Sequence, residues 1–317
     1  MIIPVKNRRD LLAAALDALD AQTLRDFEVV VVDDGSTDGS GEEAASRTIA
    51  GRSVRVVHGS ANGAVAARQV GVDAAVGEVL AFTDSDCVPR RGWLSAGVTA
   101  IHAGADVVNG LTVPERPMLP LERSVASGLE GLYPTCNIFY RRCAFEAAGG
   151  FDGNAAGRLG FRPDRRSRAD GFGEDTLLAW RVARRGTASY APEAVVEHAV
   201  FPPDYAETLS RTLRIGAFPA LVREVPELRS TLFHRHWQLG ERTRLPVYLL
   251  VVALLARRRD AAVACLVWWA ASRLNDLCDY PIPWRRRLAV LPFEMVLDAV
   301  TAGSLIVGSA SARSIAL

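Results

Sequence analysis

The chain has 317 residues, of which 49% are hydrophobic and 23% charged. This content is typical of a folded protein and excludes an intrinsically disordered chain. The length is sufficient for one large or two modest domains with a sizeable core. Because 37 basic residues nearly balance 36 acidic ones, for a net charge of +1, we do not expect nucleic acid as a partner.

The cysteines are five in number, which is odd, and no CxxC pair or metal-like spacing connects them. We therefore expect free thiols in a reducing compartment. Residues 1–7 lack the apolar core and the small-residue cleavage site of a signal peptide. On these grounds we expect the N-terminal part of the chain to be cytoplasmic.

Residues 1–110 alternate short apolar runs with helical patterns. We predict strands at 2–5, 27–32, 54–57, 79–82 and 106–108, and helices at 9–22 and 64–75. The run 27–32 ends in four valines, which is typical of a strand buried on both faces of a parallel sheet. The alternation indicates an α/β domain with a mainly parallel sheet.

Acidic pairs follow two of these strands. Asp33 and Asp34 come after the strand at 27–32, and Asp84 and Asp86 come after the strand at 79–82. Ligands bind at the carboxyl ends of the strands in such sheets. Two acidic strand ends that face one crevice repel each other unless a cation or hydrogen-bond donors lie between them. The sequence therefore predicts a polar ligand site at this edge.

Residues 153–173 are rich in glycine and arginine, and we expect them to form a mobile loop. The arginines of this segment are Arg158, Arg162, Arg165, Arg166 and Arg168. A helical pattern follows, and it begins with Glu174 and Asp175. The helix dipole favours carboxylates at that position.

The last third of the chain is apolar in a different way. Two runs, 245–256 and 261–271, flank a basic segment at 257–260, and each is too short to span a bilayer, which needs about 20 residues. They are either a helical hairpin that enters one leaflet or a buried helical pair. The stretch 289–309 contains Glu294 and Asp298, which an isolated spanning helix tolerates poorly. We expect it to lie along the interface or to pack on the domain.

Aromatic and basic residues are mixed in this region, as is typical of a headgroup boundary. They are Trp268, Trp269, Tyr280, Trp284 and the three arginines at 285–287. We therefore expect a peripheral attachment to the inner face of the cell membrane.

Four motifs occur in order along the first two thirds of the chain. They are Asp-Asp-Gly-Ser-Thr-Asp-Gly-Ser at 33–40, Asn-Gly-Ala-Val-Ala-Ala-Arg-Gln-Val-Gly at 62–71, Thr-Asp-Ser-Asp at 83–86 and Glu-Asp at 174–175. In this combination residues 1–205 resemble the inverting glycosyltransferases of family two, which have the GT-A fold. The resemblance implies a GT-A domain of α/β/α type at 1–205, with a nucleotide-binding half at 1–110 and an acceptor-binding half at 111–205. An apolar helical region at 206–317 follows it.

The resemblance also implies contacts with a nucleotide-sugar donor. The expected donor-binding residues are Pro4, Asp33, Asp34, Ser36, Asn62, Arg68, Asp84, Ser85, Asp86, Cys136 and Asn137. Carboxylates such as Asp33 and Asp34 accept hydrogen bonds from a base N–H or a ribose hydroxyl. Arg68 matches the arginine of the family's second motif, although Gln69 replaces the usual asparagine after it.

Structural roles remain open for several of these residues. Asp34 is also a turn former, with Asp38 the better candidate for a helix cap. Arg68 is also interpretable as an exposed helix residue. Cys136 and Asn137 are equally compatible with a buried strand.

Asp84 and Asp86 match the Asp-x-Asp motif of the fold, which implies a divalent cation, Mn²⁺ or Mg²⁺. A hard cation held by carboxylate oxygen neutralises the diphosphate as the sugar departs. His198 occupies the place where some relatives supply a further metal ligand, and a purely structural histidine is the alternative.

Glu174 and Asp175 match the Glu-Asp pair of the family, in which the aspartate resembles the general base. An inverting transfer needs one carboxylate to take the proton of the acceptor hydroxyl. Glu174 is expected to position the acceptor or the base, and the alternative is that both only cap the helix. No Gln-x-x-Arg-Trp motif of the processive relatives follows, so we expect the transfer of a single sugar. The loop at 153–173 is expected to close over the site.

Two other enzyme classes and a non-catalytic binding module are alternatives to a glycosyltransferase. A sugar-phosphate nucleotidyltransferase normally carries a glycine-rich N-terminal phosphate loop, and residues 1–20 contain no glycine. A dehydrogenase is disfavoured because no GxGxxG follows a first strand. A membrane-associated module that binds a nucleotide sugar without catalysis is the main alternative. The apolar C-terminal region favours a lipid or lipid-linked glycan as acceptor.

Overall fold

The protein is described by a computed structural model that covers residues 1–59, 62–160, 171–234, 238–239 and 244–317. The chain divides into two compact units. The first unit comprises Met1–Arg116, Ser124–Arg158 and Arg168–Val200, and the second comprises Pro117–Arg123, Leu159–Ser167 and Phe201–Leu317. Both ends of the proposed motif series, at 33–40 and 174–175, belong to the first unit.

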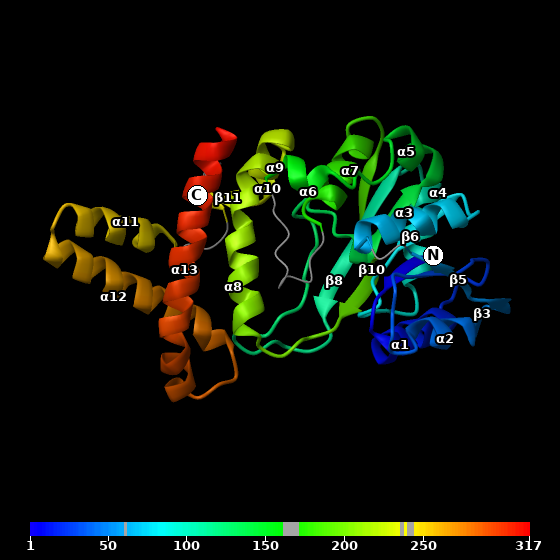
Figure 1. Cartoon of the computed structure of the whole chain (residues 1–317), viewed down its shortest axis with the longest axis horizontal. Coiled ribbons are helices and arrows are strands. Elements are labelled where there is room, and N and C mark those ends of the chain that lie inside the picture. The colour runs from blue at the N-terminus through cyan, green and yellow to red at the C-terminus, as the bar shows by residue number, and fades with distance from the viewer. Residues whose placement is uncertain (60–61, 161–170, 235–237, 240–243) are drawn as a thin grey trace. The chain divides into compact units, whose positions relative to one another are not determined.

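An eight-stranded sheet forms the centre of the first unit (Figure 1). In spatial order its strands are β5 (Arg55–His58), β2 (Val30–Asp33), β1 (Ile2–Val5), β6 (Val79–Phe82), β9 (Ile138–Arg141), β8 (Val107–Pro114), β10 (Ala188–His198) and β7 (Cys87–Pro89). β1 pairs parallel with β2 and β6, β2 with β5, and β8 with β10. β9 runs antiparallel to β6 and β8, and β7 runs antiparallel to β10. The predicted α/β class with a mainly parallel sheet is confirmed, and antiparallel β9 makes the sheet mixed.

Helices cover both faces of this sheet. α1 (Arg9–Asp20) and α4 (Trp93–His102) contribute buried residues to one core cluster, which also contains Ile3 and Val31. α3 (Ala64–Ala74), α5 (Arg142–Ala147) and α7 (Glu174–Ala183) contribute to the other, with Ile2, Val30 and Val32. Because neighbouring strand residues point to opposite faces, these alternating assignments show that β1 and β2 are buried on both sides, as predicted for the valine run.

The remaining short elements of this unit are α2 (Ser40–Ala45), α6 (Ala155–Arg158) and a small hairpin of β3 (Thr48–Ile49) and β4 (Arg52–Ser53). The predicted strands at 2–5 and 79–82 are confirmed at both ends. The predicted strand at 27–32 begins too early, because β2 starts at Val30.

Strands β7, β9 and β10 were not predicted. β9 has four residues and continues directly into α5, so no turn signal separates the two. In β10 the pairing register shifts between Ala191 and Val195, around Pro192. This irregularity interrupts the period of two by which a strand is recognised in a sequence.

The second unit is helical. Its helices are α8 (Tyr205–Arg214), α9 (Phe218–Glu224), α10 (Leu228–Thr231), α11 (Arg244–Leu255), α12 (Arg259–Asp276) and α13 (Trp284–Ala312). β11 (Phe233–His234) pairs with β12 (Gln238–Leu239). α13 packs on α8, α9 and the turn 215–217. A Cβ at Gly308 would collide with the carbonyl of Gly216, so this close approach requires glycine on α13.

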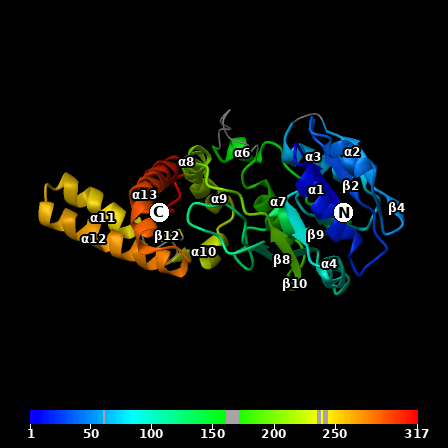
Figure 2. The ribbon, with the colours of Figure 1, turned by 90° about the horizontal axis from the view of Figure 1, so that it is seen from below.

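Helices α11 and α12 form an antiparallel pair (Figure 2). The predicted apolar runs 245–256, 261–271 and 289–309 therefore correspond to α11, α12 and part of α13. α13 is long and apolar enough to cross a membrane, by length and composition alone. Its Asp298 is buried and accepts hydrogen bonds from Trp269 and Arg273 of α12.

Candidate active site

The carboxyl ends of β1, β2 and β6 meet at one edge of the sheet because the three strands run parallel. Pro4 lies inside β1 opposite Val32, and the pairing of β1 with β6 involves Ile2 only. The missing N–H of Pro4 therefore interrupts no hydrogen-bond ladder on the β6 side. The loops after these strands hold the first group of expected donor-binding residues.

Asp33 and Asp34 have different partners. Asp33 is the last residue of β2, and its Oδ1 accepts a hydrogen bond from Ser36 N at 2.8 Å, which closes a turn. Asp34 is 4% exposed, and its Oδ2 accepts from Gly63 N at 3.0 Å. Asp34 Oδ1 is buried and has no hydrogen-bond partner among the residues that the structure describes. A buried acceptor without a donor is costly, so Asp34 Oδ1 is well suited to receive a donor from a ligand.

Ser36 and Asn62 complete this loop region. Ser36 Oγ accepts a hydrogen bond from Asn7 N at 3.0 Å, and this bond ties the β2 loop to the β1 loop. Asn62 is exposed and precedes α3. Asp38 accepts hydrogen bonds from Ser40 N and Arg9 N, the first residues of α2 and α1, both at 3.0 Å.

Arg68 of α3 connects this region with the Asp-x-Asp segment. It is 6% exposed, and its Nη2 donates to Asp84 Oδ1 at 2.6 Å. Burial disfavours the charged guanidinium, but the carboxylates of Asp84, Glu174 and Asp175 outweigh this effect and raise the pKa of Arg68. Arg68 is thus not an exposed helix arginine, and its charge is shared by Asp84 and the Glu-Asp pair.

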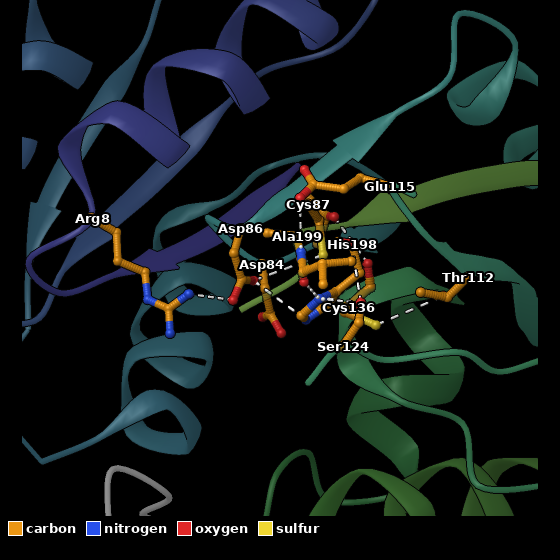
Figure 3. Close-up of polar contacts among 12 residues, drawn as sticks. Arg8, Asp84, Asp86, Cys87, Thr112, Glu115, Ser124, Cys136, His198 and Ala199 are labelled. Atoms are coloured by element: carbon orange, nitrogen blue, oxygen red, sulfur yellow. Dashed lines mark hydrogen bonds and ion pairs between the residues drawn. The ribbon is translucent and has the colours of Figure 1, made fainter. Parts of the chain in front are cut away.

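Asp84, Ser85 and Asp86 lie between β6 and β7. Figure 3 shows Asp86 between Arg8 and His198. Ser85 is 5% exposed and Asp86 8% exposed. Asp86 Oδ2 accepts a hydrogen bond from Arg8, a residue that the sequence analysis did not single out. Asp86 Oδ1 faces His198, with His198 Nε2 at 3.7 Å.

His198 closes the strand β10 directly opposite Cys87 of β7. Its Nδ1 lies 2.9 Å from the carbonyl oxygen of Ala199 and 3.2 Å from Ser124 Oγ. A carbonyl only accepts hydrogen bonds, so the neutral ring carries its proton on Nδ1. Nε2 then bears the lone pair, at the nitrogen nearest Asp86. A backbone carbonyl fixes metal-binding histidines in the same way.

Two buried thiols border this group. Cys87 Sγ lies 3.9 Å from Asp86 Oδ1, and Cys136 Sγ lies 3.7 Å from Thr112 Oγ1. Burial, followed by the neighbouring thiol of Cys136, raises the pKa of Cys87 well above its ordinary value. Sequence patterns do not predict this pair, because the two cysteines are far apart in the chain and meet only through the sheet.

These residues fit a divalent cation. One atom each from Asp86, Cys87 and His198 lies within 4.8 Å of the other two, and all three residues are nearly buried. A carboxylate oxygen and a histidine nitrogen are common ligands of divalent metals. Asp84 is nearby in the chain but engaged with Arg68, so its part in a metal site is weaker than that of Asp86.

Glu174 and Asp175 occupy the first turn of α7. Gly173 precedes them with φ at 76°, a left-handed conformation that glycine adopts without strain. Burial, followed by the neighbouring Glu174 carboxylate, raises the pKa of Asp175 to about 7, although Thr176 N donates to Asp175 Oδ1 at 2.7 Å. Glu174 is 8% exposed and its Oε2 has no hydrogen-bond partner within the described part of the chain.

Asn137 has a structural role in this arrangement. It is fully buried; its Oδ1 accepts from Trp93 Nε1 at 2.8 Å, and its Nδ2 donates to the carbonyls of Leu111 and Ala194, each at 3.0 Å. These hydrogen bonds engage both the oxygen and the nitrogen of the Asn137 side chain with neighbouring parts of the fold rather than with a ligand. Cys136 is also buried, but both residues lie in the 3-10 turn Thr135–Asn137 that precedes β9, so they are buried without being part of a strand.

Part of the expected mobile loop lies outside the described residues, including Arg162, Arg165, Arg166 and Arg168. Arg158 is described, and it pairs with Asp152.

Tyr140 of β9 is a further residue of this region that the sequence patterns did not indicate. Its hydroxyl is buried without a hydrogen-bond partner in the described ranges, and burial, followed by the charge of Asp175, raises its pKa.

Residues 1–156 match the family model described as glycosyl transferase family 2. The match covers 156 of the 317 residues, so this N-terminal part of the chain is a glycosyl transferase family 2 domain. The resemblance inferred from the motifs is thereby confirmed.

Curated relatives of this family 2 chain are also glycosyltransferases by name. Glycosyltransferase AglE of Haloferax volcanii is 33% identical over 168 residues, which are 48% of this chain and 55% of AglE. The pre-mycofactocin glycosyltransferase of Mycobacterium tuberculosis is 30% identical over 228 residues, with 62% of this chain and 42% of that protein covered. The chain thus spans about half the length of these relatives.

Solved structures share the fold. The mannosyltransferase PcManGT from Pyrobaculum calidifontis, in complex with GDP-Man and Mn²⁺, is 19% identical with a TM-score of 0.57, over 98% of this chain and 86% of that one. TarS 1–349 of S. aureus, in complex with UDP-GlcNAc, is 17% identical with a TM-score of 0.50, over 99% and 91% of the two chains. The expected GT-A fold of this family 2 chain is therefore confirmed.

Proposed function

We propose that this chain is an inverting glycosyltransferase that moves one sugar from a nucleotide-sugar donor to an acceptor hydroxyl. The observation that carries the proposal is Asp175, a half-buried carboxylate with a pKa raised to about 7. A general base works best when its pKa is near the operating pH. Arg68 connects Asp175 electrostatically with Asp84 of the Asp-x-Asp segment, which supports one common site.

Asp175 would accept the proton of the acceptor hydroxyl as its oxygen attacks the anomeric carbon of the sugar. The bond between that carbon and the diphosphate oxygen breaks on the opposite side, so the configuration inverts. Glu174 helps to raise the pKa of Asp175, because its negative charge disfavours a second negative charge beside it. With Glu174 ionised, Asp175 holds a proton more readily and acts as a stronger base.

Asp34 would bind the donor's nucleoside. Its Oδ1, which has no hydrogen-bond partner in the described part of the chain, would accept from a base N–H or a ribose hydroxyl, while Gly63 N holds the other oxygen in place. The guanidinium of Arg68 would lie near the diphosphate, where its positive charge is favourable. The two structural relatives carry GDP-Man and UDP-GlcNAc by name, and the donors to test for this chain are the sugars of GDP, UDP and TDP.

Asp86 and His198 would hold a divalent cation, with Asp84 as a further candidate. When bound, such a cation neutralises the charge that develops on the diphosphate leaving group. The Nδ1 proton of His198, directed to the Ala199 carbonyl, supports its use of Nε2 as a ligand. Arg8 would hold the other oxygen of Asp86 and thereby orient the carboxylate.

The α11–α12 pair would attach the protein to the inner face of the cell membrane. Large apolar side chains are exposed along both helices, namely Leu249, Val251, Val252, Leu254, Leu255, Val263, Leu266, Val267 and Trp268. An apolar surface of this kind is typical of a membrane or protein contact. It supports a lipid or lipid-linked glycan as acceptor. Sedimentation with vesicles of phosphatidylglycerol and phosphatidylethanolamine tests this attachment, and Leu255→Glu with Val267→Glu should abolish it.

The enzymatic proposal is tested by thermal unfolding with a panel of nucleoside diphosphates and nucleotide sugars, each with and without Mn²⁺ or Mg²⁺. A ligand that binds the native state raises the melting temperature by mass action. We expect a metal-dependent rise with one nucleotide family, followed by transfer of the matching sugar to a lipid-linked acceptor. A rise without any sugar transfer or hydrolysis would instead indicate a non-catalytic binding module.

A further inference from the structure

We propose that the Cys87 thiol is a third ligand of the cation site, so that the site binds thiophilic divalent cations such as Zn²⁺ through oxygen, nitrogen and sulfur. This inference rests on the proposed cation site at Asp86 and His198. It adds a ligand that the Asp-x-Asp motif does not contain. Its consequence is a cation preference different from that of a site built only from oxygen ligands.

The distances among the three groups are suitable for one ion. Cys87 Sγ lies 3.9 Å from Asp86 Oδ1, and His198 Nε2 lies 3.7 Å from the same oxygen. With metal–ligand bonds of about 2.0–2.3 Å, the ligands of a tetrahedral ion are about 3.3–3.8 Å apart. Only small side-chain movements are therefore needed to bring the three atoms to bonding distance of one cation.

The strand pairing of the backbone places Asp86, Cys87 and His198 close together. Cys87 and His198 face each other in the antiparallel β7–β10 pair, and Asp86 is the chain neighbour of Cys87. Cys87 is 0% exposed and Asp86 8% exposed, so water does not compete strongly for these groups. Figure 3 shows Asp86, Cys87 and His198 gathered at one point, with Arg8 on the far side of Asp86.

The chemistry of the three ligand atoms, an oxygen, a nitrogen and a sulfur, determines which ion the site prefers. Mg²⁺ is a hard cation that takes oxygen ligands, whereas Zn²⁺ accepts thiolate, imidazole and carboxylate together. On binding, the thiol proton is released to solvent and the sulfur coordinates as thiolate.

The test is a titration of the purified full chain with Co²⁺, which reports its ligands through its absorption spectrum. A sulfur-to-cobalt charge-transfer band in the near ultraviolet reveals a thiolate ligand, while the visible d–d bands report binding by any ligands. We expect the charge-transfer band in the native protein and in Cys143→Ser, whose thiol is exposed on α5. In Cys87→Ser it should be lost while the d–d bands remain.

The wild-type protein provides a second measurement that does not depend on the folding of a variant. Zn²⁺ at a concentration equal to Co²⁺ should remove the charge-transfer band, whereas a hundredfold excess of Mg²⁺ should leave it in place. Visible bands without a charge-transfer band would overturn the role of Cys87 and leave the proposed glycosyltransferase intact. A band that survives in Cys87→Ser would likewise exclude Cys87. Absence of Co²⁺ binding would overturn both the thiol ligand and the cation site of the proposed function.

Discussion

Arg68 Nη2 and Asp84 Oδ1 are 2.6 Å apart, and this ion pair joins helix α3 to the segment between β6 and β7. Arg68 is 6% exposed, so its charge is balanced by protein carboxylates more than by water. The pair therefore connects two motifs that are separate in the sequence. Its removal would leave a carboxylate without its counter-charge in the proposed donor site.

Arg68→Ala should lower donor affinity by about 10–100-fold, because a charge-assisted hydrogen bond contributes about 1.5–3 kcal/mol. Arg68→Lys should restore only part of this loss, since lysine lacks the planar fork of arginine. Isothermal titration with the nucleoside diphosphate measures both. Arg91→Ala, at an exposed arginine, serves as the control, and an equal loss in that variant would contradict the role of Arg68.

Asp34→Ala should weaken the binding of the donor nucleotide by about 10–100-fold, because the ligand would lose its acceptor and leave a donor group unpaired. Asp38→Ala, in the same loop but bonded to the starts of α1 and α2, should change stability rather than affinity. Fluorescence titration with the nucleotide distinguishes the two. Retention of full affinity by Asp34→Ala would show that Oδ1 does not contact the ligand.

The rate of sugar transfer should depend on the ionisation of Asp175. Because its pKa is raised to about 7, the fraction in the basic form falls about tenfold for each pH unit below that value. We expect kcat/KM to rise with pH up to about 7 and then to level off. Asp175→Asn should abolish transfer while it preserves donor binding. A profile that is flat from about pH 5 to 8 would exclude Asp175 as the base.

Asp175 should also lower the stability of the fold at neutral and alkaline pH. Its folded pKa of about 7 lies above the ordinary value of 3.8, so the folded state binds its proton more tightly than the unfolded state does. The free energy of unfolding therefore falls as the pH rises from about 4 to about 7. Asp175→Asn, which cannot ionise, should be more stable than the native chain by about 1–3 kcal/mol at about pH 8. Urea unfolding should show this gain shrinking toward pH 4, and an equal gain at both values would contradict it.

The ion pair between α12 and α13 should dominate the stability of the C-terminal unit. Asp298 is 4% exposed and accepts from Arg273 Nη2 at 2.7 and 2.8 Å and from Trp269 Nε1 at 2.8 Å. Asp298→Ala would leave the buried Arg273 charge with only the longer contacts to Glu294 at 3.7 Å and Asp276 at 4.0 Å among its described ion pairs, at a cost of about 2–4 kcal/mol. Asp276→Ala removes a carboxylate that is 51% exposed and 4.0 Å from Arg273, so it should cost less than about 1 kcal/mol. Thermal unfolding of the two variants compares them, and equal losses would contradict a buried pair.

The sequence by itself determined the class of fold and the order of the motifs. Local patterns are sufficient for this, because the valine run of β2 and the helical spacing in α1 depend on residues that are close in the chain. The acidic ends of β2 and β6 were placed at one edge for the same reason, since parallel strands end together. The family resemblance of residues 1–205 followed from these local motifs, and the family model matches residues 1–156.

Only the tertiary structure decided which side chains contact one another and which are available to a ligand. It brought His198 to Asp86 and Cys87, and it engaged Asn137 with Trp93, Leu111 and Ala194. It also left Asp34 Oδ1 without a hydrogen-bond donor among the described residues, while Asp33 closed a turn. These outcomes depend on contacts between strands that are distant in the sequence and on burial, which together set the energy of each polar group and are not encoded in any local pattern.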